Sequence, residues 1–365
     1  MFTFIHAADF HLDSAFGALP ARQAAARRRE SRELVNRLAD YVTEHRIDAV
    51  LLAGDLFDSG SVYRETGELL AEALGRMPAR VFISPGNHDW YGPDSPWMRI
   101  DWPDNVTIFR EDRLTAVEVP EWNAVFYGAA FTGPERRTGF LRGFTAPRDG
   151  RLHIGVLHGE PESSDPRYAP ISKAEIAACG LHYLALGHIH KRSEPMKIGT
   201  TLCAWPGCIE GRGFDELGEK GFYQGRVSED GTVEAAFVPF ARHRYVQLSV
   251  DVTGRNPAEA LRERLPQAAE EDLYRVILTG ETGESGVDVT ALQEDLGKRF
   301  YLLELRDQTA MSEELWQRAG EDSLRGLFLR ELLAYREQAQ TEAERELADR
   351  AARFGLAALS HRDFG

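Results

Sequence analysis

Apolar runs alternate with helix-like segments along the first part of the chain. Short apolar runs at 2–8 and 80–84, and a continuous apolar run at 48–53, predict short strands of a buried sheet. Segments 22–45 and 67–77 repeat their apolar residues at helical spacing and carry charge elsewhere, which predicts amphipathic helices. Strands that alternate with helices in this way predict an α/β core built on a buried sheet.

Predicted strands follow one another more closely after Pro103. We expect strands at 106–109, 115–119, 124–130, 152–157 and 183–186, and a hairpin that joins 222–227 to 233–238. Two long loops that are together rich in Gly, Pro and Ser separate some of these strands, at 160–170 and 206–221. Loops of that length inside a compact domain are usually functional or disordered.

A second, smaller unit is predicted to begin near Arg242. The remaining pattern consists of strands, a helix and a long helical end, at 245–252, 257–265, 273–278, 301–306 and from 312 onward. We therefore expect three parts: a larger domain over 1–241, a small α+β domain over 242–308 and a helical segment over 309–365.

Composition narrows the class of protein and its compartment. The 365 residues are 43% hydrophobic and 28% charged, as in soluble globular proteins, and we expect no segment that crosses a membrane. The three cysteines form no CxxC pair, which favours a reducing compartment, and we expect the cytoplasm. A net charge of −15 disfavours nonspecific binding to polyanions such as nucleic acid. If nucleic acid is the substrate, a locally basic face, cations or a partner protein must offset that charge.

Five groups of metal-binding residue types each follow a predicted strand. They are Asp9 with His11, Asp55 after Gly54, the run Gly86-Asn87-His88-Asp89, His158, and His188 with His190. The carboxyl ends of strands form the edge at which α/β sheets assemble their sites. One such group alone is more often a turn or a satisfied histidine. Five of them, with N and O donors, suit two divalent cations about 3.5–4 Å apart that activate a water for phosphoryl transfer.

In the form DxH, GD, GNHD, H and GHxH, these groups resemble the motifs of the calcineurin-like metallophosphoesterases. The opening 6–13, the second motif GDLFD at 54–58 and the run Trp205-Pro206-Gly207 are similar to the Mre11/SbcD-type DNA nuclease branch of that family, and to its bacterial YhaO-like proteins. The resemblance implies a four-layer α/β/β/α sandwich over 1–241 and a capping domain over 242–308. It also implies a homodimer, and C-terminal helices over 309–365 that dock on an SMC-like ATPase with coiled coils.

The same resemblance assigns ligands for two divalent cations. Mn²⁺ is the metal that the branch implies, although imidazole and carboxylate ligands would also accept Fe²⁺ or Zn²⁺. The first cation would be held by Asp9, His11 and His190. The second would be held by Asn87, His158 and His188, and Asp55 would bridge the two.

His88 falls on the histidine of the family that is not a ligand. It would protonate the leaving oxygen or stabilise charge on the phosphorane, and either Asp58 or Asp89 would orient it. Ser59 follows Asp58 where the GDxxDRG motif of the Ser/Thr protein phosphatases has an arginine. The chain therefore lacks the arginine that would hold a phosphomonoester.

Three functions compete on these observations. The leading one is a metal-dependent DNA exonuclease or endonuclease that acts in DNA repair with an ATPase partner. A phosphodiesterase for a small nucleotide is the second, but such an enzyme needs neither a capping unit nor C-terminal helices. A scaffold subunit with a vestigial site is the third, and the intact ligand set argues against it.

Overall fold

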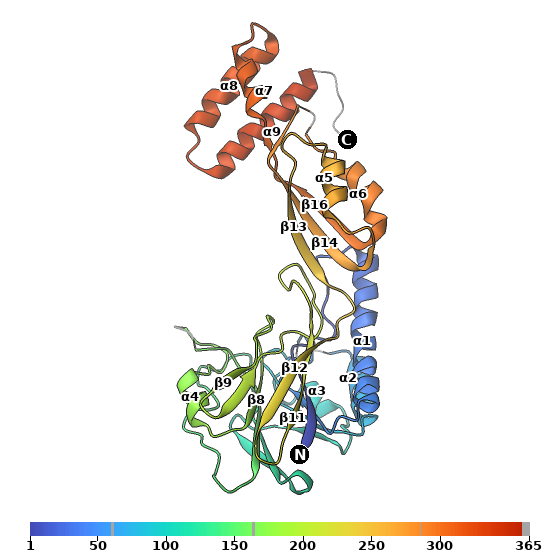
Figure 1. The fold of residues 1–365 in the computed structure, drawn as a ribbon, viewed down its shortest axis with the longest axis vertical. Helices are drawn as coiled ribbons and strands as arrows, with labels where there is room; N and C mark the ends of the chain where they lie inside the picture. The colour runs from blue at the N-terminus through green and yellow to red at the C-terminus, as the bar shows by residue number, and fades with distance from the viewer. Residues whose placement is uncertain (60–61, 163–164, 285, 360–365) are drawn as a thin grey trace. The chain divides into compact units, whose positions relative to one another are not determined.

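The computed structural model describes residues 1–59, 62–162, 165–284 and 286–359. The chain forms two compact units, Met1–Arg242 and His243–Gly365, each of which is described by itself (Figure 1). The predicted loop 160–170 and the predicted helical segment 309–365 each include a few residues that lie outside this description.

Two six-stranded sheets form the framework of the first unit. The first sheet has the order β12-β11-β1-β2-β3-β4, with β1 (Phe2–Ala7), β2 (Ala49–Leu52), β3 (Arg80–Ile83), β4 (Val106–Ile108), β11 (Gly221–Val227) and β12 (Val233–Pro239). The second has the order β5-β6-β7-β8-β10-β9, with β5 (Thr115–Val119), β6 (Ala124–Gly128), β7 (Leu152–His158), β8 (Tyr183–Gly187), β9 (Met196–Ile198) and β10 (Thr201–Ala204). In the first sheet β1 to β4 are parallel, and β11 and β12 extend it by antiparallel pairing. In the second sheet β6, β7, β8 and β10 are parallel, and the edge strands β5 and β9 pair antiparallel.

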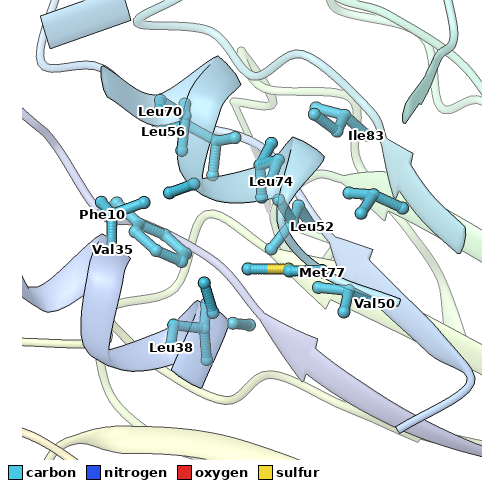
Figure 2. Packing of buried hydrophobic residues seen from close by; sticks show 14 of the residues in the cluster. Phe10, Val35, Leu38, Val50, Leu52, Leu56, Leu70, Leu74, Met77 and Ile83 are labelled. Carbon is cyan, nitrogen blue, oxygen red and sulfur yellow. The ribbon is translucent and has the colours of Figure 1, made fainter. Parts of the chain in front are cut away.

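Strand β2 shows why the central strands are apolar on both faces. Val50 and Leu52 point toward the helices α1 (Ala21–Glu44) and α2 (Arg64–Gly75), into the core that Figure 2 shows. Leu51 points the other way, into the core that lies between the two sheets. A strand that is covered on both faces buries every side chain, so its sequence is continuously apolar rather than alternating.

The second sheet repeats this arrangement. Its inner face meets the first sheet, where the rings of Phe82 and Phe126 stack with their centroids 3.9 Å apart. Its outer face buries Leu184 against Ile176 of the short helix α4 (Lys173–Ala178) and the loops around it. The layers therefore run helix, sheet, sheet, helix, which confirms the predicted α/β/β/α fold.

Short elements of the first unit escaped the sequence analysis. Strands β9 and β10 and the helix α3 (Pro96–Arg99) have three or four residues each, too few to establish a period. Helix α4 does carry a signal, because Ser172 and Glu175 form a capping box at its start. A single-turn 3₁₀ helix, Pro120–Trp122, completes the helical elements described for this unit.

The second unit opens with a parallel sheet of three strands. The order is β13-β14-β16, from β13 (Tyr245–Asp251), β14 (Ala269–Thr279) and β16 (Phe300–Asp307), and the connections contain α5 (Pro257–Arg264) and α6 (Val289–Leu296). The sequence predicted these strands and α5 but not the short helix α6. Further on, β15 (Glu281–Thr282) pairs with β17 (Ala310–Met311), and single 3₁₀ turns occupy Gly297–Arg299 and Arg318–Gly320.

Three helices end the described part of the second unit: α7 (Glu313–Gln317), α8 (Leu324–Gln338) and α9 (Glu342–Leu359). They share a small core around Trp316, Leu329 and Leu356. Throughout the described residues, every helix is too short or too polar to span a bilayer.

His6 joins the two sheets from inside the core of the first unit. Its Nε2–H donates to the carbonyl oxygen of Leu186 at 3.1 Å, and its Nδ1 accepts from the Tyr183 hydroxyl at 2.8 Å. A carbonyl can only accept, so in the neutral ring the proton lies on Nε2 and Nδ1 is the acceptor. Burial lowers the pKa of His6 to about 3.

We expect the metal-free first unit to lose stability as the pH falls from about 6.5 toward about 3, because only the unfolded chain then protonates His6. One such proton costs up to about 1.4 kcal/mol for each pH unit inside that window. Urea midpoints in a chelator at about pH 7 and pH 5 check this, with His6→Gln as the comparison. The midpoint of the variant should fall less steeply with pH. Equal slopes would show that His6 does not drive the loss.

Candidate metal centre

The predicted site residues gather at one edge of the two sheets. Strands β1, β2 and β3 are parallel neighbours in the first sheet, as β7 and β8 are in the second. The segments that leave their carboxyl ends carry all of the predicted ligands: Asp9, His11, Asp55, Asn87, His158, His188 and His190. The structure thus brings together residues that are spread over half of the sequence.

Asp9, His11 and His190 form the first group, with one potential ligand atom each inside a span of 4.8 Å. The Nε2 atoms of His11 and His190 lie 3.1 Å apart. Their outer nitrogens face carboxylates, since His190 Nδ1 lies 2.7 Å from Glu216 and His11 Nδ1 lies 3.1 Å from Asp58. Two Nε2 lone pairs this close repel unless a proton or a cation lies between them. The pair therefore fits a metal ion.

Asp55, His158 and His188 form the second group, again within 4.8 Å. His158 Nδ1–H donates to the carbonyl oxygen of Ala53 at 2.8 Å, which turns its Nε2 toward Asn87 Oδ1 at 3.0 Å. His188 Nδ1 lies 3.1 Å from the same Asn87 oxygen. A carbonyl that orients a histidine from behind is a common support for a metal ligand. The donors are imidazole nitrogens and hard oxygens, which suit a divalent cation.

Asp55 lies between the two groups. Its Oδ2 is 3.3 Å from His158 Nε2 in the second group and 3.9 Å from His11 Nε2 in the first. Its Oδ1 accepts the backbone N–H of His88 at 2.9 Å, which fixes the plane of the carboxylate. A carboxylate in this place can be shared by two cations, as the bridging role requires.

The buried carboxylates at this edge need positive charge beside them. Asp9 and Asp55 are almost fully buried, and burial raises the pKa of Asp9. Burial also opposes ionisation of Asp55, but the charge and hydrogen bond of His158 lower its pKa overall. In return, although burial alone would lower the pKa of His158, Asp55 raises it to about 9. Without metal the site thus draws a proton onto a histidine, and divalent cations would meet the same demand for charge.

Several candidate ligands hold strained backbone conformations. Asp9, His11, Asp55 and His188 have left-handed φ angles of 54°, 45°, 51° and 94°. Such angles cost about 1–3 kcal/mol each for residues other than glycine and cluster at functional sites. Backbone bonds between the loops hold them in place, from Asp9 N–H to Gly54 O at 3.0 Å and from His11 N–H to Asp55 O at 3.0 Å.

Glycines beside the ligands make room for them. A Cβ added at Gly86 would lie 2.2 Å from Asp55 Oδ1 and 2.6 Å from Asp55 N. Gly54 has a φ of +88°, and a Cβ there would lie 2.5 Å from the His158 ring. Glycine beside a ligand is expected to let the backbone and the ligand approach closely, and the structure gives both glycines this steric role.

We expect Gly86→Ala to lower phosphodiester hydrolysis by about 10²-fold or more, because a misplacement of about 1 Å at a reacting centre costs that much. The added methyl group must push Asp55 away from its place between the two groups. The hydrolysis rate of a chromogenic aryl phosphodiester measures the effect. Gly133→Ala is the matched control, because a Cβ there would meet no described atom within 4 Å. A Gly86 variant as active as the control would contradict the steric role.

His88 is exposed at the rim of the site. Its Nδ1–H donates to the backbone carbonyl of Asp58 at 3.0 Å, which leaves Nε2 as the outer nitrogen. The Asp58 carboxylate instead lies 3.1 Å from His11 Nδ1 and accepts a hydrogen bond from Arg212 at 2.9 Å. The Asp89 carboxylate accepts from backbone N–H groups, including that of Gly86 at 2.7 Å, and ties two loops together. In this geometry a backbone carbonyl, rather than a carboxylate, makes the orienting bond to His88.

Trp205 and Gly207 brace the loops that carry the histidines. Trp205 Nε1–H donates to the carbonyl oxygens of Gly159 and Gly187, at 3.2 and 3.1 Å, directly beside His158 and His188. Gly207 has a φ of +79°, and a Cβ there would lie 2.7 Å from a backbone oxygen. The motif that the sequence analysis singled out by resemblance thus has a structural role.

Arg212 and Glu216 belong to the site but were missed by the sequence analysis. Both lie in the long loop 206–221, where no residue period marks them. Burial alone would raise the pKa of the Glu216 carboxyl, but bonds from His190 and Arg212 hold it well below its usual range. The only signal in the sequence was the length of the loop.

Comparison with known proteins follows the same motifs. The sequence profile of the calcineurin-like phosphoesterases matches residues 2–192. The chain belongs to the calcineurin-like phosphoesterase family. Metallophosphoesterases are hydrolases that bind two divalent cations, and the matched range holds both groups of candidate ligands.

Two curated relatives of the chain are informative. The uncharacterized metallophosphoesterase YhaO of Bacillus subtilis (strain 168) is 31% identical over 277 residues, which cover 71% of this chain and 65% of the relative. The DNA double-strand break repair protein Mre11 of Methanopyrus kandleri is 25% identical over 348 residues, which cover 88% of this chain and 74% of the relative. The match to the Bacillus protein thus spans less than two thirds of that protein's length.

Proposed function

We propose that this phosphoesterase cleaves phosphodiester bonds in DNA, as an exonuclease or endonuclease of DNA repair, with two Mn²⁺ ions. The similarity to a protein named for DNA double-strand break repair carries this proposal. That similarity covers 88% of the chain, more than the first unit, Met1–Arg242, can account for. It therefore continues into the second unit, for which we propose the capping role over 242–308.

The proposed ligand roles follow the two groups of donors. Asp9, His11 and His190 would hold one ion, Asn87, His158 and His188 would hold the other, and Asp55 would be shared. Bound there, the ions would activate a water and stabilise charge on the phosphate. The chain's own part is to fix these donors through strained loops and through bonds such as that from His158 to Ala53.

His88 is the proposed general acid. The carbonyl of Asp58 holds its Nδ1–H, so Nε2 of the exposed ring is left to meet the substrate. As the bond from phosphorus to the leaving oxygen breaks, a protonated His88 gives the Nε2 proton to that oxygen. Asp58 is thus a positioning residue, which acts on His88 through its carbonyl.

A diester is a better substrate for this site than a monoester. Ser59 stands where the protein phosphatases have an arginine, so that contact to a dianionic phosphate is missing from the sequence. Both terminal nitrogens of Arg212, a nearby cation, are already engaged by Asp58 and Glu216. This arrangement supports hydrolysis of a phosphate that carries a single charge.

The C-terminal helices support the proposed partner. Large apolar side chains of α8 and α9 are exposed: Leu324, Leu327, Tyr335, Leu347 and Phe354. Helical spacing places Leu324 and Tyr335 on one face of α8, and Leu347 and Phe354 on one face of α9, as in helices that bind a partner through an apolar face. We propose that segment 309–365 docks on an SMC-like ATPase, and that the enzyme acts as a homodimer.

We also propose that the protein acts in the cytoplasm. Its three free cysteines agree with such a reducing compartment.

A substrate panel tests the proposal. The protein is incubated with a linear DNA duplex with frayed ends, single-stranded DNA, cyclic nucleotides and nucleotide-linked metabolites, with Mn²⁺ or with a chelator. We expect Mn²⁺-dependent degradation of DNA and little turnover of the small compounds. High turnover of one nucleotide, with DNA left intact, would overturn the DNA assignment and keep the two-metal chemistry. No turnover of any substrate, including an aryl phosphodiester, would favour a scaffold role.

A further inference from the structure

Loop 206–221 places a carboxylate and a guanidinium beside one histidine of the first donor group. Glu216 Oε1 accepts from His190 Nδ1–H at 2.7 Å and from an Arg212 terminal nitrogen at 2.9 Å. Glu216 is 4% exposed, and its other oxygen accepts the backbone N–H of Arg212 at 2.7 Å. The acid is therefore held on three sides and cannot turn away from His190.

Arg212 extends this contact to the second histidine of the same group. Its other terminal nitrogen donates to Asp58 Oδ1 at 2.9 Å, and the same Asp58 oxygen lies 3.1 Å from His11 Nδ1. One guanidinium thus joins the two carboxylates that face the outer nitrogens of His11 and His190. The planar fork of arginine suits such a link better than a lysine would.

The second donor group is supported differently. The outer nitrogen of His158 donates to the backbone carbonyl of Ala53, which depends on no side chain. Loss of Arg212 or Glu216 would therefore leave this histidine in place. The two positions of the centre differ in what holds them, so side-chain substitutions can address them separately.

We propose that Arg212 and Glu216 form a positioning clamp on His11 and His190, and that this clamp sets the affinity of the first cation position while sparing the second. The proposal rests on the two-metal site proposed above. A partner behind a ligating histidine fixes its tautomer and ring orientation, and its loss typically costs about 10–100-fold in metal affinity. The clamp is a support of the site and not a contact to substrate, because the terminal nitrogens of Arg212 are engaged within it.

Direct Mn²⁺ binding tests the clamp without any substrate. Metal-stripped wild type, Glu216→Gln and Arg212→Gln are titrated calorimetrically, and Arg212→Lys is added as the conservative variant. We expect two ions in the wild type, and in the first two variants one affinity weakened by about 10–100-fold with the other unchanged. Arg212→Lys keeps the charge and should recover part of the loss. Electron paramagnetic resonance should show isolated Mn²⁺ in the variants at metal levels that give a coupled pair in the wild type.

Arg151→Gln is the matched control, because Arg151 also joins two carboxylates, Glu118 and Asp149, but neither is a candidate ligand. Its Mn²⁺ binding should equal that of the wild type. Two affinities that fall together, or that stay unchanged in both Glu216→Gln and Arg212→Gln, would overturn the clamp. A wild type that binds fewer than two ions would instead overturn the two-metal site itself. Should Glu216→Gln fail to fold, as its thermal melting would reveal, the Arg212 pair still decides the question.

Discussion

Asp55→Asn is expected to abolish phosphodiester hydrolysis and to reduce the number of bound Mn²⁺ ions below two. The substitution keeps the shape of the side chain but removes the charge of a buried carboxylate that lies 3.3 Å from His158 Nε2 and 3.9 Å from His11 Nε2. Metal ions supply several kcal/mol of transition-state stabilisation, so the rate should fall by about 10³-fold or more. The rate on an aryl phosphodiester and a Mn²⁺ titration give the two measurements.

Asp230→Asn serves as the control for Asp55→Asn. Asp230 is exposed in the turn between β11 and β12, and its carboxylate accepts only local bonds such as that from Thr232 N–H at 2.9 Å. It should bind two ions and turn over like the wild type. If Asp55→Asn also kept two ions and most of its activity, Asp55 would not be the shared ligand.

His88→Ala is expected to lower DNA cleavage by about 10²–10⁴-fold, the usual range for loss of a general acid, while both ions stay bound. The side chain is exposed, and its backbone N–H, which alanine keeps, makes the bond to Asp55. The measurement compares DNA with an aryl phosphodiester, whose leaving group needs no proton. A general acid predicts a much smaller loss on the aryl ester.

The comparison of the two substrates separates the roles that the sequence left open for His88. Equal losses on DNA and on the aryl ester would assign His88 to charge stabilisation and contradict proton transfer. His45→Ala is a suitable control, because His45 is an exposed histidine at the end of α1. Loss of bound Mn²⁺ in His88→Ala would show that the ring supports the metal centre itself.

Much of this site could be predicted because its donors follow strands with a strong signal. The apolar run of β2 ends just before Asp55, and that of β7 ends on His158. Parallel strands bring their carboxyl ends to one edge of a sheet, so the strand assignment predicts which donors share an edge within each sheet. The packing of the two sheets, which brings His190 to Asp9 and His11, is not written in these runs. The assignment of each donor to the first cation, to the second cation or to the bridge came from the family resemblance and not from these patterns.

Other features of the site depend on information that a linear pattern does not carry. Left-handed backbone at Asp9 and Asp55 is imposed by bonds between loops and has no residue signature. The sequence does not say whether His88 bonds to the carboxylate or to the backbone carbonyl of Asp58, because that choice depends on a side-chain rotamer. Arg212 and Glu216 lie in an irregular loop, where neither helical nor strand spacing can select them.

The pairing of β1 with β11 has a consequence for how the protein is made. Strand β1 lies between β2, which follows closely in the chain, and β11, which begins only at Gly221. A ribosome that adds about 5–20 residues per second leaves that edge of β1 open for roughly ten to thirty seconds after β2 is complete. An open apolar edge is a template for wrong pairing with another chain. The nascent protein should therefore need protection during this interval, and a chain cut before β11 should aggregate rather than stay folded.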